Sequence, residues 1–242
     1  MKKMHPFLKN TFHMIKEDEI LIMLLLAPVL MAVVMKYGSI ALCNWLINDY
    51  GFDLHPYFAY IDGFVFLMGG MIYGMLIAFM IIDELDEGVI QYYKITPFGG
   101  KGYLKARFLL PLFALLILFL MISLFFTLNQ YAFTQIMVMW LFGITQMYFS
   151  GMLVVALANN KLEALVVSKM LGLVLLPFIF TVIDSPYVYL FAFFPTLFLG
   201  LGVGSMNTFM YYGYIFIAIG ITVVMIIFLR QRFFSKIYLK SE

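Results

Sequence analysis

Charged residues are scarce in this sequence. Only 12% of its 242 residues are Asp, Glu, Lys or Arg, whereas 64% are hydrophobic, and the mean hydropathy is +1.01. Typical soluble domains contain about 25% charged residues, so the polar surface available here cannot coat a water-soluble globule of this length. Most of the chain must therefore be solvated by lipid. A net charge of +2 offers no strongly basic surface, and we expect no nucleic-acid partner.

Cysteine and histidine are also rare. Cys43 is the one cysteine, so the chain cannot form an internal disulfide, and no Cys/His spacing suggests a metal site. His5, His13 and His55 lie outside the apolar segments, which leaves no zinc-binding motif for an intramembrane metalloprotease. The sequence therefore predicts no catalytic residues and no bound metal.

Six apolar segments are long enough to cross a bilayer. A spanning helix needs about 20 residues, because roughly 30 Å of hydrocarbon is crossed at about 1.5 Å per residue. The segments are residues 20–36, with a possible continuation toward Ile47, and residues 57–82, 108–127, 134–157, 165–183 and 209–229. The sequence predicts an all-α integral membrane protein with six transmembrane helices in a single domain, residues 1–242.

A further apolar stretch is shorter and interrupted. Residues 184–205 contain Pro186, Pro195 and three glycines, which disfavour a continuous helix. We expect a re-entrant or interfacial hairpin here, at the outer face between the fifth and sixth spans. A seventh span would put the two ends of the chain on opposite sides of the membrane, which the distribution of charge opposes.

Basic residues gather on one side of this arrangement. The N-terminal segment, the second-to-third loop, the fourth-to-fifth loop and the tail 230–242 hold 14 of the 15 lysines and arginines, and Lys36 is the remaining one. Because cytoplasmic loops retain Lys and Arg, these four regions are predicted to lie in the cytoplasm. Both termini of this multi-pass protein are therefore expected to be cytoplasmic.

Residues 1–19 precede the first span and have an amphipathic pattern. Six apolar side chains fall on one arc of a helix at about 100° per residue. They are Met4, Phe7, Leu8, Phe12, Met14 and Ile15. Lys9, His13 and Lys16 lie on the other side. We expect an interfacial helix in the cytoplasmic headgroup layer, anchored with its basic residues toward anionic lipid.

The second-to-third loop, residues 83–107, is longer than the roughly 2–8 residues that usually connect packed helices. It opens with an acidic group, continues as an apolar stripe at helical spacing, and stops at Thr96 and Pro97 before three glycines. The side chains predicted on the watery face are Glu84, Glu87, Gln91 and Lys94. A surface helix with one apolar and one charged face suits a soluble partner, and a solvated connector helix explains the pattern equally well.

The order of residues in this loop resembles the coupling-helix loop of type-2 ATP-binding-cassette (ABC) exporter permeases. The matching positions are Asp83-Glu84, Glu87-Gly88, Val89 to Tyr93, Thr96-Pro97, Tyr103, Lys105 and Arg107. The six spans, the interfacial helix, Ala27-Pro28 in span one and the broken hairpin also match. The loop is similar to that of small bacterial permeases labelled as drug or fluoroquinolone exporters. Members commonly have Thr after Glu-Gly, where this chain has Val89.

The resemblance implies that the chain acts as one of a pair of permeases, identical or different, in a bacterial plasma membrane. Each permease binds a cytoplasmic ABC ATPase subunit through its coupling helix. The residues implied at that contact are Asp83, Glu84, Glu87, Gly88, Gln91, Lys94, Thr96 and Pro97. The pair would export a hydrophobic or amphipathic substrate, such as a drug, a lipid-like compound or a peptide.

The chain carries no recognisable nucleotide site of its own. Its Gly-Lys candidate, Gly99 to Gly102, lacks the first glycine of a P-loop and has Gly102 where Ser or Thr would hold magnesium. ATP and magnesium are therefore expected on the partner ATPase. This chain is expected to be a transport subunit that binds no cofactor, not an enzyme.

An ion-gradient-driven secondary transporter or channel is the alternative. Such proteins usually need ionisable groups at membrane depth, and Lys36 and Asp62 are the candidates here. Helical rise puts them roughly 24 and 30 Å above the cytoplasmic edge. They can form an ion pair near the outer leaflet or snorkel separately to the interface. With so few charges, a proton relay is hard to build.

Two small residues on the second span, Gly70 and Gly74, lie one helical turn apart. Small residues at i and i+4 allow another helix to approach closely. They are predicted to mark a helix-packing seam, either within the chain or between two permeases, and a contact within the chain is favoured.

Overall fold

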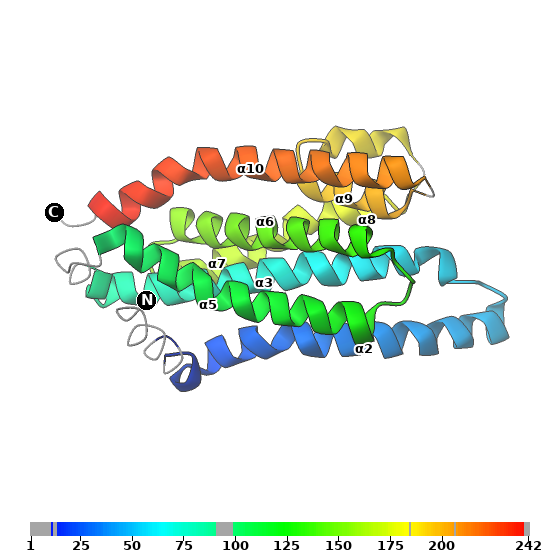
Figure 1. Cartoon of the computed structure of the whole chain (residues 1–242), viewed down its shortest axis with the longest axis horizontal. Coiled ribbons are helices and arrows are strands. Elements are labelled where there is room, and N and C mark those ends of the chain that lie inside the picture. Colours follow the sequence, from blue (N-terminus) through cyan, green and yellow to red (C-terminus); the bar gives the residue numbers. More distant parts are fainter. Residues whose placement is uncertain (1–10, 12–13, 91–98, 184, 206, 240–242) are drawn as a thin grey trace.

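The structure is a computed structural model that describes all residues except 1–10, 12–13, 91–98, 184, 206 and 240–242 (Figure 1). Its described residues form helices and connections, with no strand among them. Six helical segments of this part of the chain are long and apolar enough to span a membrane. They are Glu19–Tyr50, His55–Asp86, Gly102–Phe126, Phe133–Leu157, Lys161–Phe180 and Thr208–Lys236. The predicted all-α fold with six spans is therefore confirmed.

The long helices run alongside one another as a bundle (Figure 1). In chain order the described elements are α2 (Glu19–Tyr50), η1 (His55–Tyr57), α3 (Phe58–Asp86), α5 (Gly99–Met121), η2 (Ile122–Phe126), α6 (Phe133–Leu157), α7 (Lys161–Met170), η3 (Leu171–Leu175), α8 (Leu176–Phe180), η4 (Pro186–Phe191), α9 (Pro195–Val203) and α10 (Thr208–Leu239). The first residues of α2 and the last residues of α10 lie at the same end of the bundle, as an even number of crossings requires.

Helix α3 is the centre of the bundle. It contacts α2, α5, α6, α7 and α9. In its most apolar stretch of 18 residues, 83% of the residues are buried, whereas the value is 17% for the corresponding stretches of α2 and α10. The outer helices instead expose large apolar side chains, such as Met23 at 70% and Phe228 at 78%. Apolar side chains on the outside and a helical backbone that satisfies its own hydrogen bonds are what a lipid solvent requires.

The closest helix contact in the bundle joins α3 to α6 through small residues. A side chain at Gly70 would overlap the carbonyl oxygen of Gly143, and one at Gly74 would overlap the Ser150 hydroxyl and the carbonyl oxygen of Met147. Ser150 Oγ also donates a hydrogen bond to the Met71 carbonyl at 3.1 Å. Gly70 and Gly74 thus lie where α3 and α6 of the same chain approach each other closely, a contact that we call the glycine seam.

Two helices are longer than the apolar pattern predicts. Helix α2 extends beyond both Lys36 and the possible continuation toward Ile47, reaching Tyr50, and Gly51 then ends it in the left-handed conformation at φ 66°. Helix α5 begins at Gly99 instead of residue 108. Hydropathy marks the length that suits the membrane, whereas a helix continues until its backbone hydrogen bonding is interrupted.

The fifth span and the segment after it are less regular than the other spans. The fifth span changes from α7 through the 3-10 turn η3 to α8, which begins around Pro177. Helix η4 and helix α9 follow, and α9 packs against α8 and α10. These two short helices occupy the stretch for which the sequence predicted a hairpin. Of the predicted interfacial helix, Thr11 and residues 14–17 are described and are helical.

The α3–α6 seam gives the first prediction. Gly74→Ala places a methyl group where Ser150 and Met147 now lie, so the two central helices must separate. We expect a loss of about 1–3 kcal/mol in stability, measured as a lower thermal unfolding midpoint in detergent. Gly220→Ala is the matched control, because no atom lies within 4 Å of its added carbon. Equal midpoints for the two variants would contradict the seam.

Candidate functional site

Helix α2 begins and α10 ends at one end of the bundle (Figure 1), and the side chains of Asp18, Arg107 and Lys161 form ion pairs there. We call this the charged end. It includes the last turn of α3, the first turns of α5 and the start of α7, and it therefore contains the described part of the loop that the sequence singles out. Two groups of ion pairs lie there, one around Arg107 and one around Lys161.

The first group is a buried ion pair between Glu84 and Arg107. Arg107 Nε donates to Glu84 Oε2 at 2.8 Å, and Arg107 Nη2 donates to the other carboxylate oxygen. Tyr103 donates its hydroxyl to the same carboxylate, and Arg107 Nη1 donates to Thr11 Oγ1 at 2.7 Å. Glu84 is 1% exposed and Arg107 0%. Buried charges are stable only when paired and hydrogen-bonded in this way.

The local sequence explains why these residues meet. Tyr103 and Arg107 lie four residues apart in α5 and therefore share one helical face. Glu84 lies in the last turn of α3, which contacts α5. The prediction that Glu84 lies on a watery face is wrong, because this carboxylate points toward α5 and has a cation there. Helical spacing predicts which face of the helix carries Glu84, but it cannot predict the pairing with Arg107, which lies 23 residues further along the chain.

The second group centres on Lys161, the first residue of α7. Its Nζ donates to Asp18 Oδ2 at 2.6 Å and to Asp83 Oδ2 at 3.1 Å. Asp18 also caps α2, because its Oδ1 accepts from the backbone N–H of Ile20 at 2.8 Å. Lys161 thus joins the beginnings of α2 and α7 to the end of α3.

These bonds set the charge of Asp18. Burial raises the pKa of its carboxyl, but the hydrogen bond from Lys161 and the backbone N–H groups of Ile20 and Leu21 outweigh burial, so the pKa lies below its ordinary value. Asp18 is therefore ionised at neutral pH and remains paired with Lys161.

Glu87 and Gly88 form the turn at which α3 ends. Glu87 is exposed, and Gly88 has φ 71°, a left-handed conformation that glycine adopts without steric cost. The Gly88 N–H donates to the Leu85 carbonyl at 3.3 Å. The Glu-Gly pair thus forms the turn that ends α3, a role that the sequence pattern did not reveal.

The predicted contact residues fall into three groups. Asp83 and Glu84 stabilise the charged end through ion pairs, and Glu87 and Gly88 form the turn at its surface. Gln91, Lys94, Thr96 and Pro97 lie outside the described residues. The structure therefore separates residues that hold the loop in place from residues that are presented at the surface.

A shallow acidic groove lies beside this turn. Its volume is about 470 Å³, and the acidic residues that line it are Glu17, Asp18, Glu19, Asp83 and Glu87. Apolar atoms of Met14, Ile20 and Leu21 line the rest. Lys161 pairs with Asp18 and Asp83, whereas the exposed Glu87 lies on both the groove and the turn.

The predicted ion pair between Lys36 and Asp62 is not formed at the opposite end of the bundle. Asp62 is 2% exposed and accepts from the backbone N–H of Leu128 at 2.9 Å and of Asn129 at 3.1 Å. Lys36 Nζ donates to the carbonyl oxygen of Phe125 at 2.7 Å. Both groups therefore bind the turn between α5 and α6, whose backbone supplies nearer partners, and Asp62 does not snorkel to solvent.

The fold and this distribution of charge define the class of protein. It is a multi-pass membrane protein whose central helix is tied at one end to a network of ion pairs. The sequence model described as the Rv2686c-like fluoroquinolones export permease protein matches residues 11–230, so the chain belongs to this family of export permeases. The predicted resemblance to bacterial fluoroquinolone-export permeases is confirmed.

Two relatives are from Mycobacterium tuberculosis. They are the fluoroquinolones export permease proteins Rv2686c, of strain ATCC 25618 / H37Rv, and MT2760, of strain CDC 1551 / Oshkosh. This chain is 30% identical to each over 92 residues, which are 38% of this chain and 36% of the relative. The matched stretch thus spans about a third of the length of these relatives.

The buried ion pair gives the second prediction. Glu84→Gln leaves Arg107 as a buried cation without its counter-charge, and we expect a loss of about 3–5 kcal/mol in stability. Thermal unfolding in detergent measures it. The double variant Glu84→Leu/Arg107→Leu removes both charges and should recover much of the loss, whereas Asp86→Asn, at an exposed position in the same turn, should have little effect. A double variant less stable than Glu84→Gln would contradict the pairing.

The third prediction concerns the stability of the protein at acidic pH. The folded-state pKa of Asp18 is depressed, so its contribution to stability is complete above the unfolded value of about 3.9 and is lost as pH falls through the lower folded value. Thermal unfolding midpoints measured between neutral pH and about pH 3 should therefore fall less steeply in Asp18→Asn than in wild type. Asparagine retains the helix cap. Parallel curves for the two proteins would rule out this role of Asp18.

Proposed function

We propose that the chain is the transmembrane permease subunit of an ABC exporter, with ATP hydrolysed on a separate cytoplasmic subunit. Membership of an export-permease family supports the transport role. The observation that carries the proposal is the connection between the surface turn and the central helix. Glu87 and Gly88 directly follow α3, and Glu84, three residues before Glu87, is fixed by Arg107.

This connection suits the transmission of force. A displacement at the turn cannot be absorbed by the end of α3, because the Glu84–Arg107 and Asp83–Lys161 pairs attach it to α5 and α7. Helix α3 in turn contacts most of the bundle. A movement driven by an ATPase at the charged end would therefore shift the spans as a group, which is what alternating access requires.

The acidic groove supports an electrostatic contact with the ATPase. Glu87 lies on the groove and on the turn at once, so a basic segment of the partner would meet both features. Such charge complementarity mainly sets orientation and rate of association. In this proposal the charged end and both termini face the cytoplasm of a bacterial cell, and ATP and magnesium bind the partner.

The transported substance is proposed to be hydrophobic or amphipathic. Two apolar hollows support this, one of about 570 Å³ between α5, α6 and α10 and one of about 800 Å³ beside α6, α9 and α10. Aromatic residues line both, including Phe108 and Tyr148 in the first and Phe149 and Phe228 in the second. The relatives are named as fluoroquinolone exporters, and planar aromatic drugs of this kind are the first substrates to test.

A second permease, identical or different, would complete the pathway. The exposed apolar side chains of α2, α5 and α10 provide surface for a partner helix as well as for lipid. The alternative, a secondary transporter driven by an ion gradient, has less support from the structure. Lys36 and Asp62 are the candidate ionisable groups near the membrane interior, and both bind the α5–α6 turn.

The fourth prediction tests the ATPase contact. The protein is purified from its native membrane in mild detergent, and we expect an ATPase subunit with a P-loop to co-purify. Glu87→Lys reverses the charge at both the turn and the groove and should abolish recovery of the ATPase. Asp49→Lys, an exposed charge reversal near the opposite end of α2, should leave recovery unchanged.

Two outcomes would overturn this proposal. One is recovery of the ATPase with Glu87→Lys at the wild-type level together with unchanged ATP-dependent drug export. The other is purification of the chain alone, with flux in liposomes that follows an imposed ion gradient instead of ATP. The second outcome would favour the secondary transporter.

A further inference from the structure

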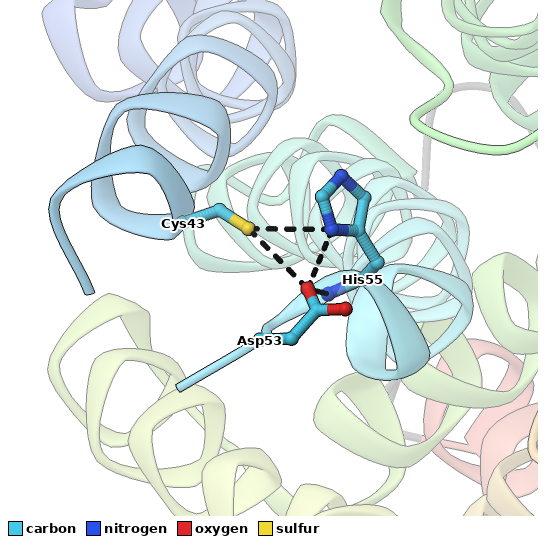
Figure 2. Close-up of side chains that lie close together, drawn as sticks. All are labelled: Cys43, Asp53 and His55. Carbon is cyan, nitrogen blue, oxygen red and sulfur yellow. Dashed lines mark hydrogen bonds and ion pairs between the residues drawn. The ribbon is translucent and has the colours of Figure 1, made fainter. Parts of the chain in front are cut away.

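Three metal-binding side chains converge at the end of the bundle opposite the charged end, where α2 connects to α3 (Figure 2). Cys43 Sγ lies 3.6 Å from His55 Nδ1 and 3.9 Å from Asp53 Oδ1, and His55 Nδ1 lies 2.5 Å from Asp53 Oδ1. A thiol, an imidazole and a carboxylate thus point toward one another from two segments of the chain. None of them takes part in the proposed coupling site.

The local backbone brings these residues together. Gly51 ends α2 in a left-handed conformation, and the chain then turns back along the last turns of the helix. Asp53 Oδ1 accepts from the backbone N–H of His55 at 2.9 Å, which fixes the carboxylate beside the ring. Cys43 lies on the side of α2 that faces this returning segment and is 1% exposed. Because the spacing of the three residues matches no common motif, the sequence alone predicted no metal here.

The geometry does not match that of a catalytic triad. In a Cys-His-Asp triad the thiol and the carboxylate use different ring nitrogens, whereas here both approach Nδ1 of His55. A nucleophilic cysteine must also be reachable by a substrate, and Cys43 is buried. A single proton on Nδ1 can serve only one of the two neighbouring acceptors at a time. A divalent cation at this point could instead be bound by the Cys43 sulfur, the Asp53 carboxylate and the His55 ring nitrogen at the same time.

We propose that Cys43, Asp53 and His55 bind a zinc ion. Thiolate, imidazole and carboxylate are the ligands that zinc uses in proteins, and harder cations such as magnesium and calcium prefer oxygen alone. The side chains of His55 and Asp53 are 62% and 58% exposed, so the ion can enter from water and keep a water molecule as its fourth ligand. In a tetrahedral site with zinc–ligand distances of about 2.0–2.2 Å, Nδ1 and Oδ1 separate to roughly 3.3 Å. A small side-chain rotation provides this.

The bound ion would connect the last turns of α2 to the beginning of α3. Helix α2 is one of the least buried spans, and its second half contacts η2 through the hydrogen bond from Lys36 to Phe125. A metal bridge would therefore restrict α2 at the side of the membrane away from the ATPase. The site is independent of the export proposal, because its ligands are all in this chain and remote from the charged end.

Cobalt substitution tests the site directly. Protein without a histidine tag is purified in detergent and titrated with Co²⁺, and thiolate bound to Co²⁺ gives a charge-transfer band in the near ultraviolet. Because Cys43 is the only cysteine, the band can come from no other thiol of the chain. We expect saturation at equimolar metal and displacement of the band by Zn²⁺. Loss of one ligand should weaken binding about 100-fold or more, beyond the 10–100-fold typical of outer-shell changes.

The variants separate the three ligands. Cys43→Ser should abolish the band, while His55→Ala and Asp53→Asn should weaken Co²⁺ and Zn²⁺ binding as stated. Asp49→Asn, an exposed carboxylate near the same end of α2, is the matched control and should bind like wild type. Thermal unfolding in EDTA, without bound metal, checks that each variant is folded. In a separate measurement without EDTA, Zn²⁺ should raise the unfolding midpoint of wild type and of Asp49→Asn only.

Either of two results would overturn the site. In the first, folded wild-type protein gives no charge-transfer band at excess Co²⁺, even if Zn²⁺ binds elsewhere on the chain. In the second, His55→Ala and Asp53→Asn bind metal as tightly as wild type, which would show that the cysteine binds without them. The exposed positions of Asp53 and His55 keep this test available even if Cys43→Ser does not fold.

Discussion

The buried ion pair between Glu84 and Arg107 is the interaction on which the arrangement of the charged end depends. It fixes the last turn of α3 to the first turns of α5 and, through Thr11, to the segment before α2. Pairing two charges inside a protein contributes little net stability, because their desolvation offsets most of the attraction. The pair instead fixes the position of α3 relative to α5. Because leaving either charge buried without its partner would strongly destabilise the fold, the two helices are held where both charges are paired. Lys161 does the same for α2, α3 and α7 with partly exposed partners.

The two ends of the bundle use polar groups for the same purpose and differ in what they fix. At the charged end, side chains of opposite charge bind one another and hold helices together. At the other end, Asp62 and Lys36 bind the backbone of the α5–α6 turn, and Cys43, Asp53 and His55 approach one another between α2 and α3. Between the ends the helices pack through apolar side chains and the glycine seam of α3 and α6. Lipid provides no drive to bury apolar surface, so close fit and polar contacts must supply the specificity.

The described helices also differ in how deeply they are buried in the bundle. Helix α3, which ends at the charged end, is also the described helix with the most neighbours, and it approaches α6 closely at the glycine seam. Helices α2 and α10 are mostly exposed, although α2 packs against α3 and α10 packs against α6 and α9. A closely packed core of α3 and α6 with more exposed outer helices suits the proposed transport role, in which groups of helices move past one another.

The sequence by itself determined the six spans, the glycine seam and the family, because these depend on local properties: apolar length, small residues one turn apart, and the order of residues in one loop. It did not determine where helices begin and end, since α2 continues to Tyr50 before Gly51 ends it, and α5 covers Gly99–Met121 although the apolar segment begins at residue 108. The tertiary structure alone decided which charges meet. Glu84 was expected to face water, and Lys36 and Asp62 were expected either to pair or to snorkel separately. Each instead has a partner in another element, and Cys43 approaches Asp53 and His55 across a turn. Pairing depends on distances between segments, and helical periodicity contains no information about those distances.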